Sequence, residues 1–388
     1  MNEQIAYVLD NFPGPTAGTE GQFWLLYKLM CSTGVPPRVF TLRESAFLSG
    51  EIPDRYECLG IGSLSALSSL RKAFLFARRL KGEGVRIAHL FLNDTSVLLP
   101  LFLWCFGIKV IVSRRDLGFW YTAAILRLLR FNRHFVSRVI ANCGAVADVT
   151  WYKEHYPLNK ISVVLNGCHK PENIEALNLR TRFNIEPQAI ILGMVANLRP
   201  LKGIQDAIWA VATLKMLGVK TYLFVAGADV LTHGVSERKR LEQSALELNI
   251  ADQIIFLGPV KSSWPLLKEL DIFLSCSSSE GLSNSIVEAM AAGLAVVATS
   301  VGGTPSIIRH EHSGLLYAPG KLNDLVTCIM SYVKNPLWKE HIAEEAKAFA
   351  ETQLSPEALL AAHERIYTQL LNINRAAHTQ PITSIASE

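Results

Sequence analysis

The chain has 388 residues, of which 49% are hydrophobic and 19% are charged, and its formal net charge is +4. This composition excludes a disordered chain, and the length favours two domains over one. The net charge is too small to indicate a nucleic-acid partner. Seven cysteines are scattered without a CxxC pair, which predicts free thiols in a reducing compartment and no structural zinc. We therefore expect a cytoplasmic protein, and we expect no secretory signal because residues 1–14 lack a basic and a long apolar region.

Short β-branched runs alternate with amphipathic segments along the whole chain, which is typical of parallel sheets with crossover helices. In the first half the expected strands are 5–10, 85–92, 109–114, 138–142 and 162–166. In the second half they are 190–196, 221–227, 253–258, 272–276 and 295–300, with a helix over 284–292. The sequence thus predicts the α/β class with two doubly wound domains, whose ligands should bind at the carboxyl ends of the strands.

A polar, unpatterned seam at 166–189 separates the two series of strands and predicts the domain boundary. Residues from 356 have apolar side chains at helical spacing after a serine–proline start. We expect that helix to pack back on the N-terminal domain. The predicted parts are an N-terminal domain 1–168, a linker 169–188, a C-terminal domain 189–355, a helix 356–372 and a flexible tail 373–388.

A glycine-rich turn follows the first expected strand and leads into a helix. Gly14, Gly18 and Gly21 allow the backbone to approach an anion, and a helix N-terminus offers unpaired amides. The turn lacks the GxGxxG spacing, so an ordinary turn capped by Thr19 explains it equally well.

Two stretches bear on membranes. The apolar run 97–112 is interrupted by Pro100, Gly107 and Lys109, which favours a buried helix followed by a strand over a membrane span. Residues 114–138 hold six arginines, one acidic residue and an apolar helix face. That stretch predicts either contact with an anionic membrane surface or a packed helix with solvated arginines.

In the second half, two cations follow the strand that ends near Ala196. Arg199 and Lys202 could neutralise a diphosphate from this loop, although a solvated pair is the simpler interpretation of the segment alone.

The stretch SSSEGLSNSIVEAMAAG, residues 277–293, contains Glu280 and Glu288. Ser285 and Glu288 match a capping box, which gives Glu288 a structural role. Glu280 has none, because it falls in the loop at the carboxyl end of a strand. Downstream, residues 302–304 predict a further turn-to-helix anion site.

The motifs VANLRPLKG, LDIFLSCSSSEGLSNSIVEAMAAG and GLLY, with the weaker AGTEGQ turn, occur in an order that resembles family 4 of the retaining glycosyltransferases. The resemblance covers most of the chain and is strongest over 191–317. It implies the GT-B fold, in which two Rossmann-like domains face each other across a cleft. It also implies a nucleotide-sugar donor, most often a UDP-sugar, and no required metal or other cofactor. The expected acceptor is a glycan or lipid-linked glycan of surface polysaccharide such as lipopolysaccharide.

The resemblance also implies residue roles. Glu280 and Glu288 would be the two glutamates of the EX7E motif, with Glu280 on the donor sugar and Glu288 on the ribose. Lys202 would bind the diphosphate, which Gly18 would flank from the other domain. The remaining donor contacts would come from the amides of Leu282, Ser283 and Asn284.

Three positions depart from the family pattern. Asn197, at the donor site, stands where an arginine is common, which makes Arg199 the candidate replacement. Ser283 replaces a frequent glycine. On the acceptor side Asp116 matches the aspartate of a histidine–aspartate pair, but Arg115 holds the histidine position.

The predicted function is therefore a retaining hexosyltransferase, cytoplasmic or peripheral on the inner face of the membrane. In the expected front-face mechanism, cations and amides stabilise the departing diphosphate. Two alternatives stay open: a nucleotide-sugar epimerase or phosphorylase on the same architecture, and a non-catalytic sugar-nucleotide-binding protein.

Overall fold

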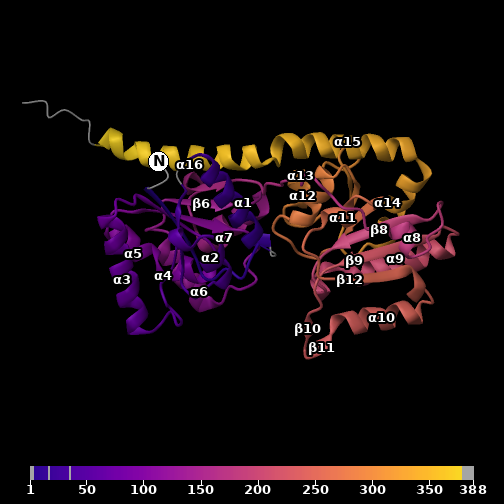
Figure 1. Cartoon of the computed structure of the whole chain (residues 1–388), viewed down its shortest axis with the longest axis horizontal. Coiled ribbons are helices and arrows are strands. Elements are labelled where there is room, and N and C mark those ends of the chain that lie inside the picture. Colours follow the sequence, from indigo (N-terminus) through magenta and orange to yellow (C-terminus); the bar gives the residue numbers. More distant parts are fainter. Residues whose placement is uncertain (1–3, 16–17, 35, 378–388) are drawn as a thin grey trace, which may run out of the picture. The chain divides into compact units, whose positions relative to one another are not determined.

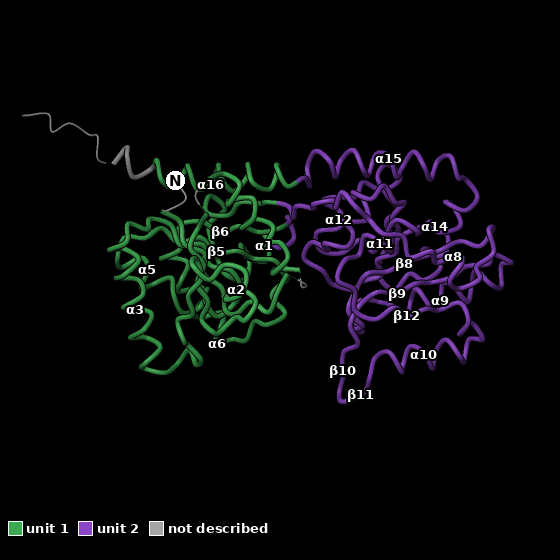
Figure 2. The backbone as a smooth tube through the Cα atoms, in the orientation of Figure 1, with its two compact units in different colours: residues 1–142, 147–164, 356–388 green, residues 143–146, 165–355 purple. Residues whose placement is uncertain are grey.

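The computed structural model describes residues 4–15, 18–34 and 36–377. The chain divides into two compact units (Figure 2). Unit 1 comprises Met1–Asn142, Ala147–Val164 and Pro356–Glu388, and unit 2 comprises Cys143–Val146 and Leu165–Ser355.

Unit 1 is built on a parallel sheet with the strand order β3-β2-β1-β4-β5-β6-β7. The central strands β1 and β4 are buried along their whole length because both faces of the sheet are covered. The strands are β1 Ile5–Leu9, β2 Arg38–Thr41, β3 Tyr56–Cys58, β4 Ile87–Leu90, β5 Lys109–Arg114, β6 Arg138–Ala141 and β7 Ile161–Val163. The helices of this half of the chain are α1 Gly18–Ser32, α2 Ala46–Glu51, α3 Leu67–Gly82, α4 Asn93–Leu98, α5 Pro100–Cys105, α6 Ala123–Asn132 and α7 Gly144–Glu154.

Unit 2 is built on a second parallel sheet with the order β12-β9-β8-β13-β14-β15, which lies between α15 and α10 (Figure 1). The strands are β8 Ile190–Val195, β9 Thr221–Ala226, β12 Ile254–Gly258, β13 Ile272–Ser275, β14 Ala295–Thr299 and β15 Leu315–Tyr317, with a small hairpin of β10 Leu231–Thr232 and β11 Val235–Ser236. The helices are α8 Leu179–Arg182, α9 Ile204–Met216, α10 Glu237–Glu247, α11 Trp264–Leu267, α12 Asn284–Ala291, α13 Thr304–Ile307, α14 Leu322–Lys334 and α15 Pro336–Gln353. The strand order reverses between β8 and β13, and such a switch point is where doubly wound sheets bind ligands.

Every strand expected from the sequence is present, within three residues at its ends, and so is the helix expected over 284–292. The strands β2, β3 and β15 were not expected. They have three or four residues each, and β3 and β15 lie at sheet edges, so their periodic signal is weak. The run 97–112 forms α5 and then enters β5, as predicted, and the described part of the chain contains no helix with the length and hydropathy needed to cross a membrane.

The segment 169–188 is not a linker, because it folds with unit 2. The Glu269 carboxylate accepts hydrogen bonds from the amides of Asn178 and Leu179, at 2.7 and 2.6 Å, at the start of α8. Arg180 then pairs with Asp271 at 3.1 Å. The carboxylates of Glu269 and Asp271 thus hold this polar segment at the start of α8, although its sequence has no strong periodicity.

The last helix, α16 Pro356–Ala377, belongs to unit 1 and packs against α1. It extends past the expected end at 372, and the rest of the expected tail, 378–388, lies outside the described residues. A buried polar cluster joins it to the sheet: His89 bonds the Tyr367 hydroxyl through Nδ1 at 2.8 Å and the Ser113 hydroxyl through Nε2 at 2.9 Å. His89 is therefore a satisfied core histidine.

Candidate functional site

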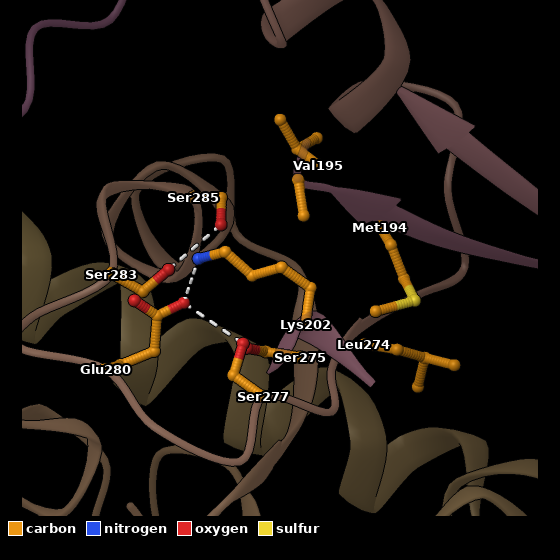
Figure 3. Close-up of a pocket in the computed structure, with 10 residues that line it drawn as sticks. Met194, Val195, Lys202, Leu274, Ser275, Ser277, Glu280, Ser283 and Ser285 are labelled. Atoms are coloured by element: carbon orange, nitrogen blue, oxygen red, sulfur yellow. Dashed lines mark hydrogen bonds and ion pairs between the residues drawn. The ribbon is translucent and has the colours of Figure 1, made fainter. Parts of the chain in front are cut away.

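A small hollow in unit 2 lies at the carboxyl ends of β8 and β13, where the strand order reverses (Figure 3). It brings together residues that are up to 91 positions apart in the sequence. They are Met194, Val195, Ala196, Lys202, Leu274, Ser275, Ser277, Glu280, Ser283 and Ser285. Two of the charged residues singled out in the sequence, Lys202 and Glu280, therefore share one site.

Lys202 and Glu280 form an ion pair inside this hollow, where their side chains are only 23% and 15% exposed (Figure 3). The Ser277 hydroxyl donates a second bond, of 3.0 Å, to the same carboxylate oxygen. Burying either charge alone would be costly, and the pair offsets that cost. The lysine can approach because Gly203 follows it in the left-handed region, with φ of +64°, where a Cβ would lie 2.0 Å from the Cys276 carbonyl oxygen.

The loop that carries Glu280 is braced from below by the turn at residues 302–303. Gly302 has φ of +53°, and a Cβ there would lie 1.7 Å from the Glu280 carbonyl oxygen. The Gly303 amide donates a 2.6 Å bond to the Gly281 carbonyl, and the Thr304 amide donates to Val301. The anion site expected at 302–304 is therefore wrong, because these amides hold the loop and α13 has only four residues.

Leu282, Ser283 and Asn284 form the entry to α12 and are fixed by a residue that the sequence analysis missed. The Asn166 side-chain amide donates to the Leu282 carbonyl at 3.1 Å and to Asn284 Oδ1 at 2.7 Å. Asn166 is 2% exposed. Its position at the end of the last expected strand of the first series, 162–166, was the only signal available.

The capping box expected between Ser285 and Glu288 does not form. The helix begins two residues earlier than that box requires, with Ser283 as the N-cap and without a side-chain capping bond. Glu288 then lies beyond the third helical position, from which a side chain could reach back to the cap. Ser283 and Ser285 bond each other through their hydroxyls at 3.0 Å instead.

Glu288 is instead held by Ser263, whose hydroxyl donates a 2.5 Å bond to Oε2. Burial raises the pKa of the Glu288 carboxyl, and the bond from Ser263 acts in the opposite direction. A buried carboxylate with one hydrogen bond retains capacity for further donors. Because the capping box does not form, helix capping does not account for the presence of Glu288 at this position.

Arg199 and Asn197 are not among the residues that line the hollow. Arg199 is exposed at the start of the turn that ends with Lys202. Asn197 is also exposed and accepts a 3.1 Å bond from the Ala228 amide through Oδ1, so it braces the neighbouring loop.

Gly18 and Asp116 belong to unit 1 and are described apart from the residues above. Gly18 is the first residue of α1, and residues 16–17 before it lie outside the described ranges. Asp116 accepts bonds from the Gly118 amide at 2.7 Å and from Trp120 Nε1 at 3.1 Å, and burial raises the pKa of its carboxyl. In the resolved ranges 4–15, 18–34 and 36–377, no cluster of three or more His, Cys, Asp or Glu side chains is arranged to hold a metal ion.

Solved structures share this fold over nearly the whole chain. HepE of Anabaena, in complex with UDP, has a TM-score of 0.81 at 19% identity, with coverage of 94% of this chain and 100% of that one. WaaG, a glycosyltransferase involved in lipopolysaccharide biosynthesis, has a TM-score of 0.69 at 18% identity, with coverage of 94% and 99%. The fold is the GT-B fold of two Rossmann-like domains, which confirms the expected class.

Residues 177–349 match the family model described as "Glycosyl transferases group 1". The N-acetyl-alpha-D-glucosaminyl L-malate synthase of Bacillus anthracis is 27% identical over 50% of this chain and 49% of its own length. An O-antigen biosynthesis glycosyltransferase of Escherichia coli is 21% identical over 84% of this chain and 90% of its own. The chain spans about half the length of curated relatives such as the synthase. These matches show that the second half of the chain is similar to glycosyltransferases of group 1, within a chain that has the GT-B fold.

Proposed function

We propose that this chain is a retaining, metal-independent glycosyltransferase of family 4. It moves a hexose from a nucleotide-sugar, with UDP as the nucleotide, to a glycan or lipid-linked acceptor in surface polysaccharide biosynthesis. The observation that carries the proposal is the convergence of Lys202 and Glu280 at the β8–β13 switch point, with Glu288 eight residues further on, inside the segment that matches the family model.

The donor roles follow from charge and position. Lys202 neutralises the diphosphate, and the amides at 282–284, whose loop Asn166 fixes, donate to phosphate or sugar oxygens. Glu280 contacts the sugar, and Glu288 accepts from the ribose hydroxyls. Arg199 is close enough in sequence to add a second cation, and Gly18 and Asp116 serve the diphosphate and the acceptor from unit 1.

The ion pair between Lys202 and Glu280 gives donor binding a specific first step. A diphosphate must replace the Glu280 carboxylate as the partner of the Lys202 ammonium, which frees that carboxylate for the sugar hydroxyls. The same lysine then stabilises the charge that builds up on the diphosphate as the glycosyl bond breaks. The departing phosphate accepts the acceptor proton on the same face, and no protein nucleophile is assigned.

Two kinds of comparison support the substrates. Structures of HepE are described as complexes with UDP and with UDP-glucose. Relatives include a lipopolysaccharide core biosynthesis glycosyltransferase of Rhizobium meliloti, 29% identical over 58% of this chain and 60% of its own length.

The membrane contact expected over 114–138 is proposed for its second half alone. Arg114 is buried in a bidentate pair with Glu154, at 2.8 Å for each bond, and cannot face a bilayer. Arg127 and Arg130 are exposed on α6, where Leu128 and Phe131 are 49% and 53% exposed. That helix face suits peripheral contact with an anionic inner membrane surface.

A thermal-shift screen of UDP-, GDP- and ADP-sugars tests the donor proposal, since a ligand that binds only the folded state raises the melting temperature. We expect a UDP-sugar to stabilise the wild type and to lose that effect in Lys202→Ala. A screen in which no nucleotide-sugar shifts the wild type would contradict the proposal.

A further inference from the structure

A second hollow lies in unit 1, with a volume of about 450 Å³. It is formed where the end of α6 meets the end of α7 and the short helical turn Leu158–Lys160. Its lining is Arg133, His134, Trp151, His155, Tyr156, Pro157 and Lys160. None of these residues has a place in the donor site, and none of them is acidic.

The hollow is held together by its own cations. Lys160 Nζ donates to the carbonyls of Arg133 and Val136 at 2.9 and 2.7 Å, and Arg133 donates to the His155 carbonyl at 3.3 Å. His155 stands in the left-handed region, with φ of +62°, directly after α7 ends at Glu154. The cationic side chains are therefore positioned by main-chain carbonyls and by a 3.4 Å bond from Arg133 Nε to His134 Nε2, so the shape of the hollow does not depend on a ligand.

These carbonyl bonds do not balance the charge. Cations at the end of a helix complement its dipole, and this explains one ammonium at the end of α6. Neither cation has a carboxylate as counter-ion, because among residues 4–15, 18–34 and 36–377 no carboxylate forms an ion pair with either Arg133 or Lys160. Burial, and then the charge of Arg133, lower the pKa of the Lys160 ammonium, as expected for two cations without a counter-ion.

The surroundings are also short of negative charge. Between residues 117 and 163 the acidic side chains are Asp148, which is exposed, and Glu154, which is buried against Arg114. Lys160 keeps one N–H beyond its two carbonyl bonds, and the guanidinium of Arg133 offers a planar fork. A tetrahedral oxyanion can accept from both, because it presents several oxygens at once.

The lining of the hollow also includes apolar side chains. Trp151, which is 51% exposed, lines the hollow together with Pro157 and the buried Tyr156. An exposed indole next to a basic group is suited to a ligand that has a charged end and a carbon skeleton. The volume lies within the range of small-ligand sites, about 300–1,000 Å³.

We propose that this hollow binds a phosphate ester, with the phosphate between Arg133 and Lys160 and the ester carbons on Trp151. The ester can come from a lipid headgroup or from a soluble phosphate, and the experiment below separates these sources. The inference concerns unit 1 and does not rest on the proposed glycosyl transfer.

The full-length protein is titrated with sn-glycerol 3-phosphate and followed by tryptophan fluorescence, without any sugar donor. A parallel arm measures co-sedimentation with phosphatidylcholine vesicles with and without phosphatidylglycerol. Both arms use the wild type, Arg133→Gln and Trp151→Phe. Lys153→Gln is the matched control, since Lys153 is an exposed cation of α7 that does not line the hollow and lies outside the proposed membrane face of α6. Circular dichroism checks that each variant is folded.

We expect saturable binding that weakens about tenfold in Arg133→Gln, as the loss of one charge-assisted contact implies, and that stays within about twofold in Lys153→Gln. The fluorescence change should disappear in Trp151→Phe. Binding in the soluble arm identifies a free phosphate ester as a ligand, and binding confined to phosphatidylglycerol vesicles identifies the headgroup. Equal losses in Lys153→Gln and Arg133→Gln would show diffuse charge attraction and overturn the proposal, as would an absence of saturable binding in both arms.

Discussion

Ser263 donates a 2.5 Å hydrogen bond from its hydroxyl to the partly buried carboxylate of Glu288, 25 residues further along the chain. Ser263 is 8% exposed and precedes α11, whereas Glu288 lies within α12. Burial raises the pKa of the Glu288 carboxyl, and the hydroxyl favours its ionised form. Ser263 is thus a positioning residue that keeps the proposed ribose ligand oriented and charged.

Removing this hydroxyl should weaken donor binding more than turnover. In Ser263→Ala the raised pKa of Glu288 should rise further, so the loss of donor affinity as the pH falls should begin at a higher pH. One bond to a charged group corresponds to about tenfold in the donor dissociation constant. Calorimetric titration between pH 5 and 8 measures this, and Ser263→Thr, which keeps the hydroxyl, should recover most of the affinity. An unchanged pH profile in Ser263→Ala would contradict the role.

The Lys202–Glu280 pair should separate into two different kinetic effects. Lys202→Met removes a charge that acts most strongly on the departing diphosphate, so kcat should fall about a hundredfold or more. Glu280→Gln keeps the size of the side chain and frees the lysine, so it should impair sugar recognition and raise KM more than Lys202→Met does. The matched control is Lys220→Met, which breaks the exposed pair with Glu186 in the same unit. A similar loss in that control would trace the effect to general destabilisation.

The turn beneath Glu280 offers a test that touches no donor-binding side chain. Gly302→Ala places a methyl group against the Glu280 carbonyl, where a Cβ would lie at 1.7 Å, and should displace the loop and abolish the donor-induced thermal shift. Gly320→Ala is the control, because Gly320 also has positive φ, +78°, but has open space around its Cβ position. Both variants carry the left-handed strain of about 1–2 kcal/mol, so only the clash distinguishes them. Equal donor binding in both would show that the turn does not support the site.

Acid should loosen unit 1 through the histidines that hold α16. Burial lowers the pKa of His363 from 6.5 to about 4, so the folded state holds fewer protons than the unfolded chain between these values. The stabilisation is then complete above about pH 6.5 and is lost as the pH falls towards 4, and it corresponds to about 3 kcal/mol. The melting temperature, measured between pH 7.5 and 4.5, should fall less steeply with decreasing pH in His363→Gln than in the wild type. The exposed His341→Gln should leave the slope unchanged, and equal slopes for all three proteins would contradict the effect.

Much of the fold was predictable because long buried strands carry a strong apolar signal. The paired β8 and β13, which create the switch point, were read directly from IILGMVA and IFLSC. The edge strand β15 was not, since three residues are too few to show a period. The segment 169–188 was misassigned because its order comes from Glu269, almost a hundred residues away.

The residues of the candidate site also fall into those that the sequence could predict and those that it could not. Lys202 and Glu280 stood out because each is a charged residue in a loop after a strand. Asn166 and Ser263 did not, because their roles consist of contacts with residues 118 and 25 positions away that only the folded chain reveals. The capping box at Ser285 was wrong for a local reason: a shift of two residues in the helix start removes the geometry on which that motif depends.

The most direct test of the central claim is the configuration of the first sugar product. The protein is incubated with the UDP-sugar that gives the largest thermal shift, and proton NMR records the anomer of the transferred or released sugar before it can mutarotate. We predict UDP together with a sugar that keeps the donor's anomeric configuration, and no such products from Lys202→Met. An inverted anomer, an epimerised nucleotide-sugar or equal turnover by Lys202→Met would contradict the account.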